Sequence, residues 1–361
     1  MPEVYVSLGE NSYKIQLKQH GLSELGSYMR DLGMGHNTLI ITNPVINQYY
    51  GDIVQAGLTN AGFTVWMEEI PAGEGTKSFG RTMQLYDRAI QLGMDRKSPI
   101  IALGGGVVGD LTGFIAATYM RGIPFIQVPT TLLAQVDSSV GGKVAVNHPL
   151  GKNLIGAFYQ PKLVLIDPAA LITLPDREWL SGFAEVIKYG VIQDADFFNL
   201  LAGESLANLR TDINKMTEII QRACEIKASV VSADEKETGL RIILNYGHTI
   251  GHALESASNY QRYTHGEAIA IGMVGAARLA NLIGWLSDEE CQRIATVIAS
   301  YGLTIRFSGI DLAVIEERLY HDKKKEGNNI RWVLPKAIGT VDTTTEMPVE
   351  LIRQVLVELS N

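Results

Sequence analysis

Two histidines and a glutamate in the segment LNYGHTIGHALE have types and spacings that suit metal binding. His248 and His252 lie four residues apart, and Glu255 follows three residues later. Residues three or four apart share one face of a helix, so the three side chains could converge on one ion. Two histidines and a carboxylate with an open position are typical of catalytic zinc. Histidines satisfied by backbone carbonyls are the structural alternative, and the spacing does not decide which of the two is a ligand.

Two further segments strengthen the metal hypothesis. HGEA places His265 just before another apolar helical segment, and GFAEVIKYG places Glu185 and Lys188 three apart on a mostly apolar helix. Burying ionisable side chains is costly unless they are paired or bind a metal. The sequence therefore predicts a metal site whose ligand set stays open.

The segment GGGVVGD satisfies G-x-G-x-x-G through Gly104, Gly106 and Gly109, after an apolar strand and at the start of a helix. Glycines let the backbone approach a pyrophosphate, and the helix N-terminus supplies N–H donors. A tight turn without a ligand is the alternative. The acidic residue expected about twenty residues later in a common dinucleotide fold is absent, and Thr130 and Thr131 stand there instead. A nucleotide is favoured, but the ordinary dehydrogenase fold is not.

Cationic residues occupy glycine-rich or apolar settings in a chain of formal net charge −8. Each alone is compatible with a solvated side chain, and Lys227 could extend along its helix to water. Together they predict one anion pocket for a substrate with more than one negative group, such as a phosphate and a carboxylate. The residues are Lys143, Lys152, Lys227, Arg241 and the run Lys323 to Lys325.

The elements that position these residues fall into two types. Apolar strands alternate with helical segments up to about residue 175, which predicts an α/β domain with a parallel sheet over residues 1–175. Helical periodicity dominates afterwards, so residues 176–361 are predicted to form a mainly α-helical domain. Residues 330–348 are expected to form a short hairpin before a closing helix.

Composition excludes several classes of protein. No basic tract interleaved with aromatic residues occurs, so nucleic acid and anionic membranes are poor candidate partners. No apolar run approaches the length of a membrane span, and the N-terminus has no secretory signal pattern. With only Cys224 and Cys291, a disulfide framework is not expected. We expect a soluble cytoplasmic protein.

Taken together, the motifs resemble those of the 3-dehydroquinate synthase family over nearly the whole chain and in the same order. They are GGGVVGDLTGFIAATYMRG, VPTTLLAQVDSSVGGKVAVN, GKNLIGAFYQP, GFAEVIKYG, LNYGHTIGHALE and HGEAIAIGM. The resemblance implies a Rossmann-like N-terminal domain that binds NAD and a helical C-terminal domain that carries zinc or cobalt. It also implies a homodimer.

The resemblance further implies roles for individual residues. The metal ligands would be Glu185, His248 and His265, which leaves His252 as a pocket residue. NAD would contact Glu74, Lys77, Gly105, Gly106, Val107, Gly109, Asp110, Thr130 and Thr131, with Lys143 and Lys152 nearby. Asn43 stands where some members carry an acidic residue. The substrate pocket would comprise Asp137, Lys143, Lys152, Asn153, Lys188, Lys227, Glu237, Arg241, Asn245, His252 and Lys324, with Arg121 reaching the partner subunit's site.

The implied reaction converts 3-deoxy-arabino-heptulosonate 7-phosphate to 3-dehydroquinate and phosphate. It proceeds by NAD-dependent oxidation at C5, phosphate elimination, re-reduction, ring opening and aldol closure. Three alternatives stay open: a cyclase for a substrate without the carboxylate, a metal-dependent polyol or alcohol dehydrogenase, and a nucleotide-sensing or scaffolding protein without catalysis.

Overall fold

The computed structural model describes residues 2–323 and 330–361. They form two compact units. Unit 1 comprises the chain up to Leu174 together with Ile213–Lys236, and unit 2 comprises Pro175–Asp212 and Glu237–Asn361. A single boundary at residue 175 therefore does not separate the units, because a helical segment beyond it belongs to the first.

Unit 1 is built on a seven-stranded sheet with the order β1-β2-β9-β6-β5-β3-β4. β1 and β2 pair antiparallel, as a hairpin, and all other neighbours are parallel. β5, with the sequence IIALG, is buried at every position, as expected for a strand covered on both faces. The strands are β1 (Glu3–Val6), β2 (Tyr13–Leu17), β3 (Asn37–Thr42), β4 (Thr64–Glu69), β5 (Ile100–Gly104), β6 (Phe125–Pro129) and β9 (Leu163–Ile166).

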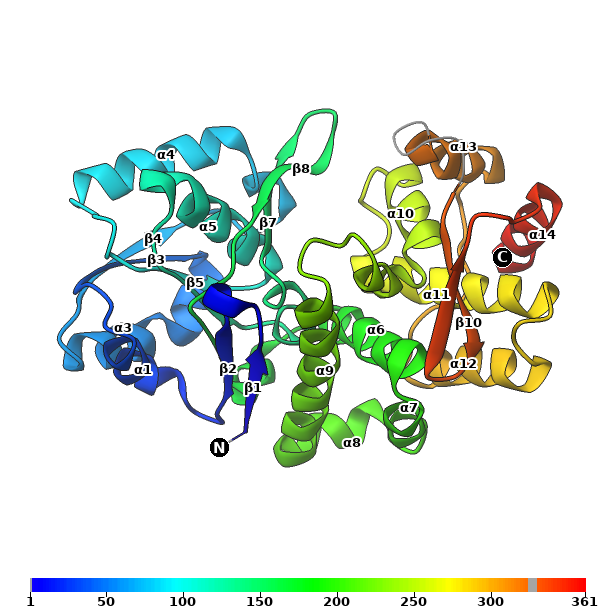
Figure 1. The fold of residues 1–361 in the computed structure, drawn as a ribbon, viewed down its shortest axis with the longest axis horizontal. Helices are drawn as coiled ribbons and strands as arrows, with labels where there is room; N and C mark the ends of the chain where they lie inside the picture. The colour runs from blue at the N-terminus through cyan, green and yellow to red at the C-terminus, as the bar shows by residue number, and fades with distance from the viewer. Residues whose placement is uncertain (1, 324–329) are drawn as a thin grey trace. The chain divides into compact units, whose positions relative to one another are not determined.

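Helices cover both faces of this sheet (Figure 1). Leu25 of α1 and Val54 of α3 pack in the core of one face, whereas Leu85 of α4 and Phe114 of α5 pack in the core of the other. The α-helices of the unit are α1 (Leu25–Asp31), α2 (Pro44–Ile46), α3 (Asp52–Asn60), α4 (Phe79–Gln91), α5 (Gly106–Thr118) and α9 (Ile213–Ala233). Shorter helical turns are η1 (Gly9–Asn11), η2 (Leu22–Glu24), η3 (Asn47–Gly51), η4 (Glu74–Thr76), η5 (Tyr119–Arg121), η6 (Ala134–Ser138) and η7 (Pro168–Thr173).

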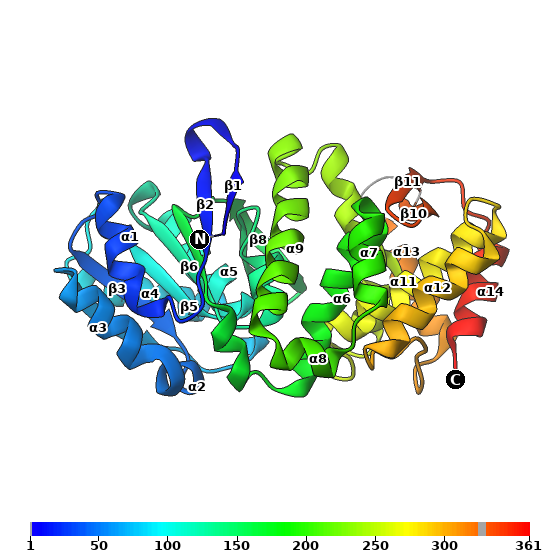
Figure 2. The ribbon, with the colours of Figure 1, turned by 90° about the horizontal axis from the view of Figure 1, so that it is seen from below.

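The helix that returns to unit 1, α9, runs beside β1 (Figures 1 and 2). The backbone N–H of Ser7 donates to the Ser232 hydroxyl at 3.0 Å. Cys224 of α9 is fully buried, and its thiol contacts the carbonyl of Gln135 at 3.3 Å. Helix α9 is thus part of the α/β unit.

The sheet has a topological switch point between β3 and β5. β4 lies on one side of β3, whereas β5, β6 and β9 follow on the other side. Ligands of such sheets bind beyond the carboxyl ends of the strands at the switch point. Asn43 follows β3 there, and Gly105 follows β5.

A separate antiparallel hairpin joins β7 (Lys143–His148) and β8 (Gly151–Phe158). Val144 and Val146 alternate into the core beside α5, which fixes the face that the hairpin turns inward. Lys143 and Lys152 therefore lie on strands. The neighbouring glycines predict loops at these two lysines, and the alternation of Val144 and Val146 is too short to predict a strand from the sequence.

Unit 2 is mainly helical, and the predicted C-terminal hairpin and closing helix are confirmed. Its helices are α6 (Asp176–Gln193), α7 (Ala195–Ala202), α8 (Leu206–Thr211), η8 (Leu240–Asn245), α10 (His248–Ala257), α11 (His265–Leu282), α12 (Asp288–Ser300), α13 (Leu312–Lys323) and α14 (Val349–Leu359). Its hairpin joins β10 (Trp332–Ala337) to β11 (Thr340–Thr344). The predicted fold class, a parallel α/β domain and a helical one, is confirmed. In the described part of the chain, no helix has both the length and the apolar character needed to cross a membrane.

The two cysteines are expected to differ in reactivity. Burial raises the pKa of the Cys224 thiol to about 12; it also raises the pKa of Cys291 on α12, but that thiol is partly exposed. Because only the thiolate is nucleophilic, Cys224 should stay protonated and unreactive between pH 7 and 9. Titrating native protein with a disulfide reagent should label one thiol promptly and the second only after unfolding. A Cys291→Ser variant should lose the prompt signal, and two thiols reacting at similar rates would contradict the burial of Cys224.

Candidate metal centre and dinucleotide site

Close helix packing in unit 2 brings ligand-type side chains together. A Cβ on Gly272 of α11 would lie 1.9 Å from the carbonyl oxygen of Gly247, the residue that precedes α10. A Cβ on Gly266 of α11 would lie 2.2 Å from the backbone oxygen of Ser181 of α6. Glycine at these positions therefore lets the backbones of α10 and α6 lie directly against α11.

Each of these helices contributes one residue to a cluster. Glu185 comes from α6, His248 begins α10 and His265 begins α11. Their ligand atoms all lie within 4.8 Å of one another. The Nε2 atoms of His248 and His265 lie 3.8 and 3.6 Å from Oε1 of Glu185, which is fully buried. One carboxylate and two imidazoles at this separation fit a divalent metal such as zinc or cobalt.

The two histidines of the cluster have opposite pKa shifts. Burial, followed by the positive charge of Lys188, holds the pKa of His248 well below its usual range. Burial also opposes the charging of His265, but the carboxylates of Glu185 and Glu255 outweigh it and raise the pKa of His265 to about 10. At neutral pH His248 is thus neutral, whereas His265 holds a proton that a bound metal would have to displace.

Metal uptake is therefore expected to release about one proton at pH 7.5. Because the pKa of His265 is raised in the metal-free protein, metal affinity should rise with pH and weaken as the pH falls. Calorimetric titration with Zn²⁺ in two buffers of different ionisation enthalpy measures the number of protons released. Binding with no proton release would show that His265 is already neutral before the metal arrives.

The structure does not bring His248, His252 and Glu255 together as one ligand set. The rings of His248 and His252 are 5.2 Å apart and nearly perpendicular. His248 groups with Glu185, whereas His252 and Glu255 form a second group that shares His265. Spacing along one helix could not show that α6 and α11 supply the residues that group with His248.

Other predicted residues of unit 2 lie on α6 and around η8. The Lys188 ammonium contacts the Glu185 carboxylate, and both side chains are buried. Arg241 is also buried, and the amide of Asn245 donates to Oε1 of Glu237 at 3.0 Å. Lys324 lies outside the described residues. Its predicted role remains a prediction.

In unit 1, the glycine turn leaves the N-terminus of α5 without a side-chain cap, as in turns that bind phosphate groups. Gly105 precedes α5, and no side chain caps the helix there. The N–H of Thr130 donates to the carbonyl of Gly104 at 3.0 Å, which fixes the ends of β5 and β6 side by side. A Cβ on Gly106 would lie 2.9 Å from the Ser138 hydroxyl, so glycine keeps this approach open. Val107, Gly109 and Asp110 follow in the first turns of α5, and Thr131 follows β6.

A polar network links the segment 74–77 to α5 and to the β7–β8 hairpin. Lys77 is buried, and its ammonium donates to Asp110 at 2.6 Å and also to the side chain of Asn153. Asn147 donates to Glu74 at 2.7 Å and accepts the N–H of Asn153 at 2.9 Å. Asn147 was missed by sequence reasoning, because nothing in its local pattern distinguishes it from any other strand residue.

Four more predicted residues of unit 1 have definite surroundings. Lys227 does not extend to water. Its ammonium donates to two oxygens of Asp137, the backbone carbonyl at 2.7 Å and the side-chain carboxylate at 2.6 Å. The Asn43 side chain caps α2 by accepting the N–H of Ile46 at 3.0 Å. Arg121 ends η5 with a positive φ of 66°, directly after Met120 with φ 50°, so the backbone at this turn is strained.

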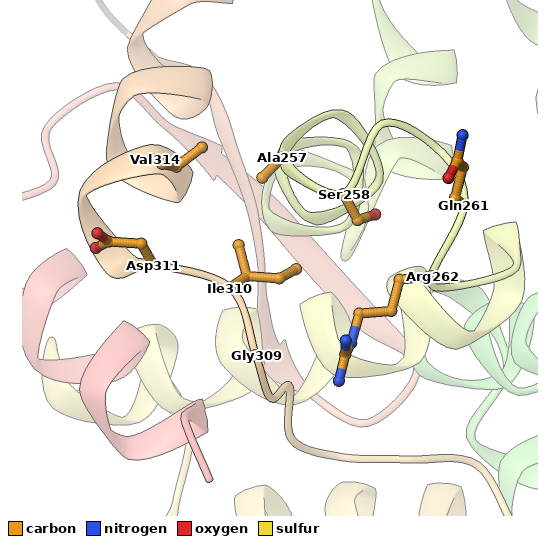
Figure 3. A pocket seen from close by; sticks show the side chains of 8 residues that line it. All are labelled: Ala257, Ser258, Gln261, Arg262, Gly309, Ile310, Asp311 and Val314. Atoms are coloured by element: carbon orange, nitrogen blue, oxygen red, sulfur yellow. The ribbon is translucent and has the colours of Figure 1, made fainter.

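A separate surface hollow of about 480 Å³ lies at the C-terminal end of α10 (Figure 3). It is lined by Ala257, Ser258, Gln261, Arg262, Gly309, Ile310, Asp311 and Val314. Among the residues that the structure describes, neither the candidate metal ligands nor any other predicted site residue lines it. It is therefore no part of the candidate site.

The chain has the same fold as two synthases that were solved with NAD⁺ and a divalent metal. It is similar to 2-deoxy-scyllo-inosose synthase complexed with carbaglucose-6-phosphate, NAD⁺ and Co²⁺, at 29% identity over 99% of both chains with a TM-score of 0.89. It is also similar to 2-epi-5-epi-valiolone synthase from Streptomyces hygroscopicus subsp. jinggangensis 5008 with NAD⁺ and Zn²⁺ bound. That likeness has 27% identity over 98% of both chains and a TM-score of 0.89.

The chain belongs to the 3-dehydroquinate synthase family. Residues 67–181 match the family's N-terminal model and residues 182–325 its C-terminal model. The chain is also 50% identical to 3-dehydroquinate synthase from Synechococcus sp., over 99% of both chains. The resemblance stated from the motifs is thereby confirmed, and with it the expectation of an enzyme.

Proposed function

We propose that this chain converts 3-deoxy-arabino-heptulosonate 7-phosphate to 3-dehydroquinate and phosphate, using catalytic NAD and a divalent metal. The observation that carries the proposal is the buried cluster of Glu185, His248 and His265 in a chain whose other unit has an uncapped glycine turn at a sheet switch point. The identity to 3-dehydroquinate synthases over the full length supports the choice of substrate.

Residues of this chain fit both a divalent metal and NAD. Glu185, His248 and His265 would hold the metal, and the backbone from Gly105 to Gly109 would hold the pyrophosphate of NAD. When bound, the metal acts as a Lewis acid toward a substrate hydroxyl and NAD⁺ accepts a hydride. The zinc- and cobalt-bound neighbours support a choice between these two metals.

Buried cationic residues of the chain would bind the two anionic groups of the substrate, its phosphate and its carboxylate. Lys188 and Arg241 are buried cations of unit 2, and Lys227 is a buried cation of unit 1. Such groups stabilise charge that develops on a leaving phosphate, since they are oriented before the reaction begins. The contact of Lys227 with Asp137 holds its ammonium in one orientation, as does that of Lys188 with Glu185.

We assign two polar side chains of unit 2 to positioning or proton relay. His252 is exposed on α10 and shares the second ligand-type group with Glu255 and His265. Asn245 is oriented by its hydrogen bond to Glu237. A dedicated base is not required by this scheme, because the substrate phosphate can itself accept the C6 proton.

We also propose an oligomeric state and a cellular location for the protein. We infer a homodimer in which Arg121 completes the partner's site, as the family resemblance implies; the strained backbone at Met120 and Arg121 supports a specialised turn. We also propose a cytoplasmic location, which suits two cysteines that remain free thiols in the structure.

Phosphate release with NAD far below substrate tests the function. Metal-reconstituted protein, the heptulosonate phosphate and a small amount of NAD⁺ should release many equivalents of phosphate per NAD⁺. No net NADH should form, and a chelator should stop the reaction. Accumulating NADH would indicate a polyol dehydrogenase, whereas neither signal from folded, metal-loaded protein would indicate a cyclase for substrates that lack the carboxylate.

A further inference from the structure

We propose that Glu255 is a positioning residue for the metal site, which orients His265 and fixes the ring nitrogen that His265 offers to the metal. The inference rests on the proposed function, since it assumes that Glu185, His248 and His265 hold a divalent ion. It gives Glu255 a role distinct from that of a ligand.

The His265 imidazole lies between two carboxylates. Its Nδ1 is 3.4 Å from Oε2 of Glu255, and its Nε2 is 3.6 Å from Oε1 of Glu185. A neutral imidazole carries a proton on one nitrogen and a lone pair on the other. If Glu255 accepts the proton of Nδ1, the lone pair is confined to Nε2, on the side of Glu185. A carboxylate in this place also makes the ring a more basic ligand.

His248 shows the same arrangement with a different acceptor. Its Nδ1 lies 3.1 Å from the backbone oxygen of Tyr246, which can only accept, and its Nε2 lies 3.8 Å from Oε1 of Glu185. Both histidines therefore direct Nε2 to the same carboxylate oxygen. The Nδ1 of His248 faces a neutral acceptor, the Tyr246 carbonyl, whereas the Nδ1 of His265 faces the Glu255 carboxylate.

The local fold holds Glu255 in place for this purpose. It lies on the buried side of α10 with 7% of its surface exposed. His265 is set at the first turn of α11 by the Thr264–Glu267 capping box, in which each residue's side chain accepts the other's backbone N–H. The N–H of Gly266 donates to the Ser181 hydroxyl of α6 at 3.1 Å, which ties the same turn to the helix of Glu185.

The rival arrangement makes Glu255 a direct ligand with His252 and His265, whose ligand atoms also lie within 4.8 Å of one another. An ion there would take His265 through the nitrogen that faces Glu255. His265 could not then serve the Glu185 group with the same lone pair. His252 is exposed, whereas Glu185 is fully buried, so the Glu185 group is the better shielded site.

Cobalt binding to full-length variants tests the proposal. Affinity for Co²⁺ is measured by competition with a chromophoric chelator, and the visible spectrum of bound Co²⁺ reports ligand geometry. Glu255→Ala should lower affinity by roughly 10–100-fold and change the spectrum, as loss of an outer partner of a metal histidine does. Glu255→Gln, whose amide oxygen can still accept from Nδ1, should recover a spectrum close to wild type with a smaller loss of affinity.

The other outcomes overturn the proposal in distinguishable ways. If Glu255→Gln and Glu255→Ala both lose Co²⁺ as completely as Glu185→Gln does, Glu255 is a ligand. If affinity and spectrum stay at wild type in both variants while only thermal stability falls, Glu255 is merely structural. Wild-type protein that fails to bind Co²⁺ would instead refute the proposed function. Glu178→Gln on α6, outside the cluster, is the matched control and should bind as wild type does.

Discussion

Glu185→Gln is expected to lower metal affinity by more than roughly 100-fold, beyond the range set by outer partners of metal ligands, and to reduce turnover to background. The substitution keeps the shape of the side chain but removes the negative charge that both histidines approach through Nε2. An amide is a poor ligand for zinc or cobalt compared with a carboxylate. Metal content after dialysis against the free ion, together with phosphate release, measures both effects.

A companion variant separates metal loss from unfolding. Removing the Glu185 charge leaves the Lys188 ammonium buried, at a cost of about 3–5 kcal/mol for a broken buried pair. A double variant, Glu185→Gln with Lys188→Met, removes both charges and should recover most of that stability while still failing to bind metal. Glu178→Gln on the same helix should keep both metal and activity. Metal retained by the double variant at wild-type affinity would eliminate Glu185 as a ligand.

Gly272→Ala should destabilise the chain by about 3 kcal/mol, at the upper end of the usual range for overpacking. The new Cβ would lie 1.9 Å from the carbonyl oxygen of Gly247, and backbone cannot yield as a flexible side chain does. Because Gly247 precedes His248, relief of this clash would change the position of His248 relative to Glu185. Denaturant unfolding measures the stability loss, and Zn²⁺ titration measures the accompanying loss of metal affinity.

Gly80→Ala is the matched control for this substitution. Gly80 lies in the first turn of α4, where a Cβ would meet nothing within 4 Å. Alanine restricts the unfolded chain, so this variant should be neutral or more stable by up to about 1 kcal/mol. If Gly272→Ala is as harmless as Gly80→Ala, then α10 and α11 are not as close as the structure shows.

The sequence was most informative where a pattern is local. An apolar strand followed by glycines and a helical segment identified the Gly105 turn. The alternation of apolar strands with helices predicted the α/β sheet. The first metal hypothesis used only the spacing within α10, and it grouped His248 with His252 and Glu255. The sequence patterns around Glu185 and His265 supported a metal site, but it was the motif resemblance across the chain that assigned these two residues as ligands.

What sequence reasoning missed depends on contacts between distant segments. Lys227 was compatible with a solvated position, because its partner Asp137 lies ninety residues earlier in the chain. Asn147 orients Glu74 and Asn153 through contacts that no periodicity encodes. The approach of Gly272 to Gly247 depends on how two helices pack, which a sequence pattern of small residues alone does not specify.

The return of α9 to unit 1 has a consequence for biosynthesis. The chain passes from one unit to the other after Leu174, Asp212 and Lys236, so the α/β unit is interrupted by a helical insert. A ribosome that has produced only residues 1–174 has made every strand of the large sheet but not the helix that buries Cys224 against Gln135. Closure of that unit must wait for at least sixty more residues to emerge. Cutting the gene at residue 175 should therefore not yield an independently stable α/β unit.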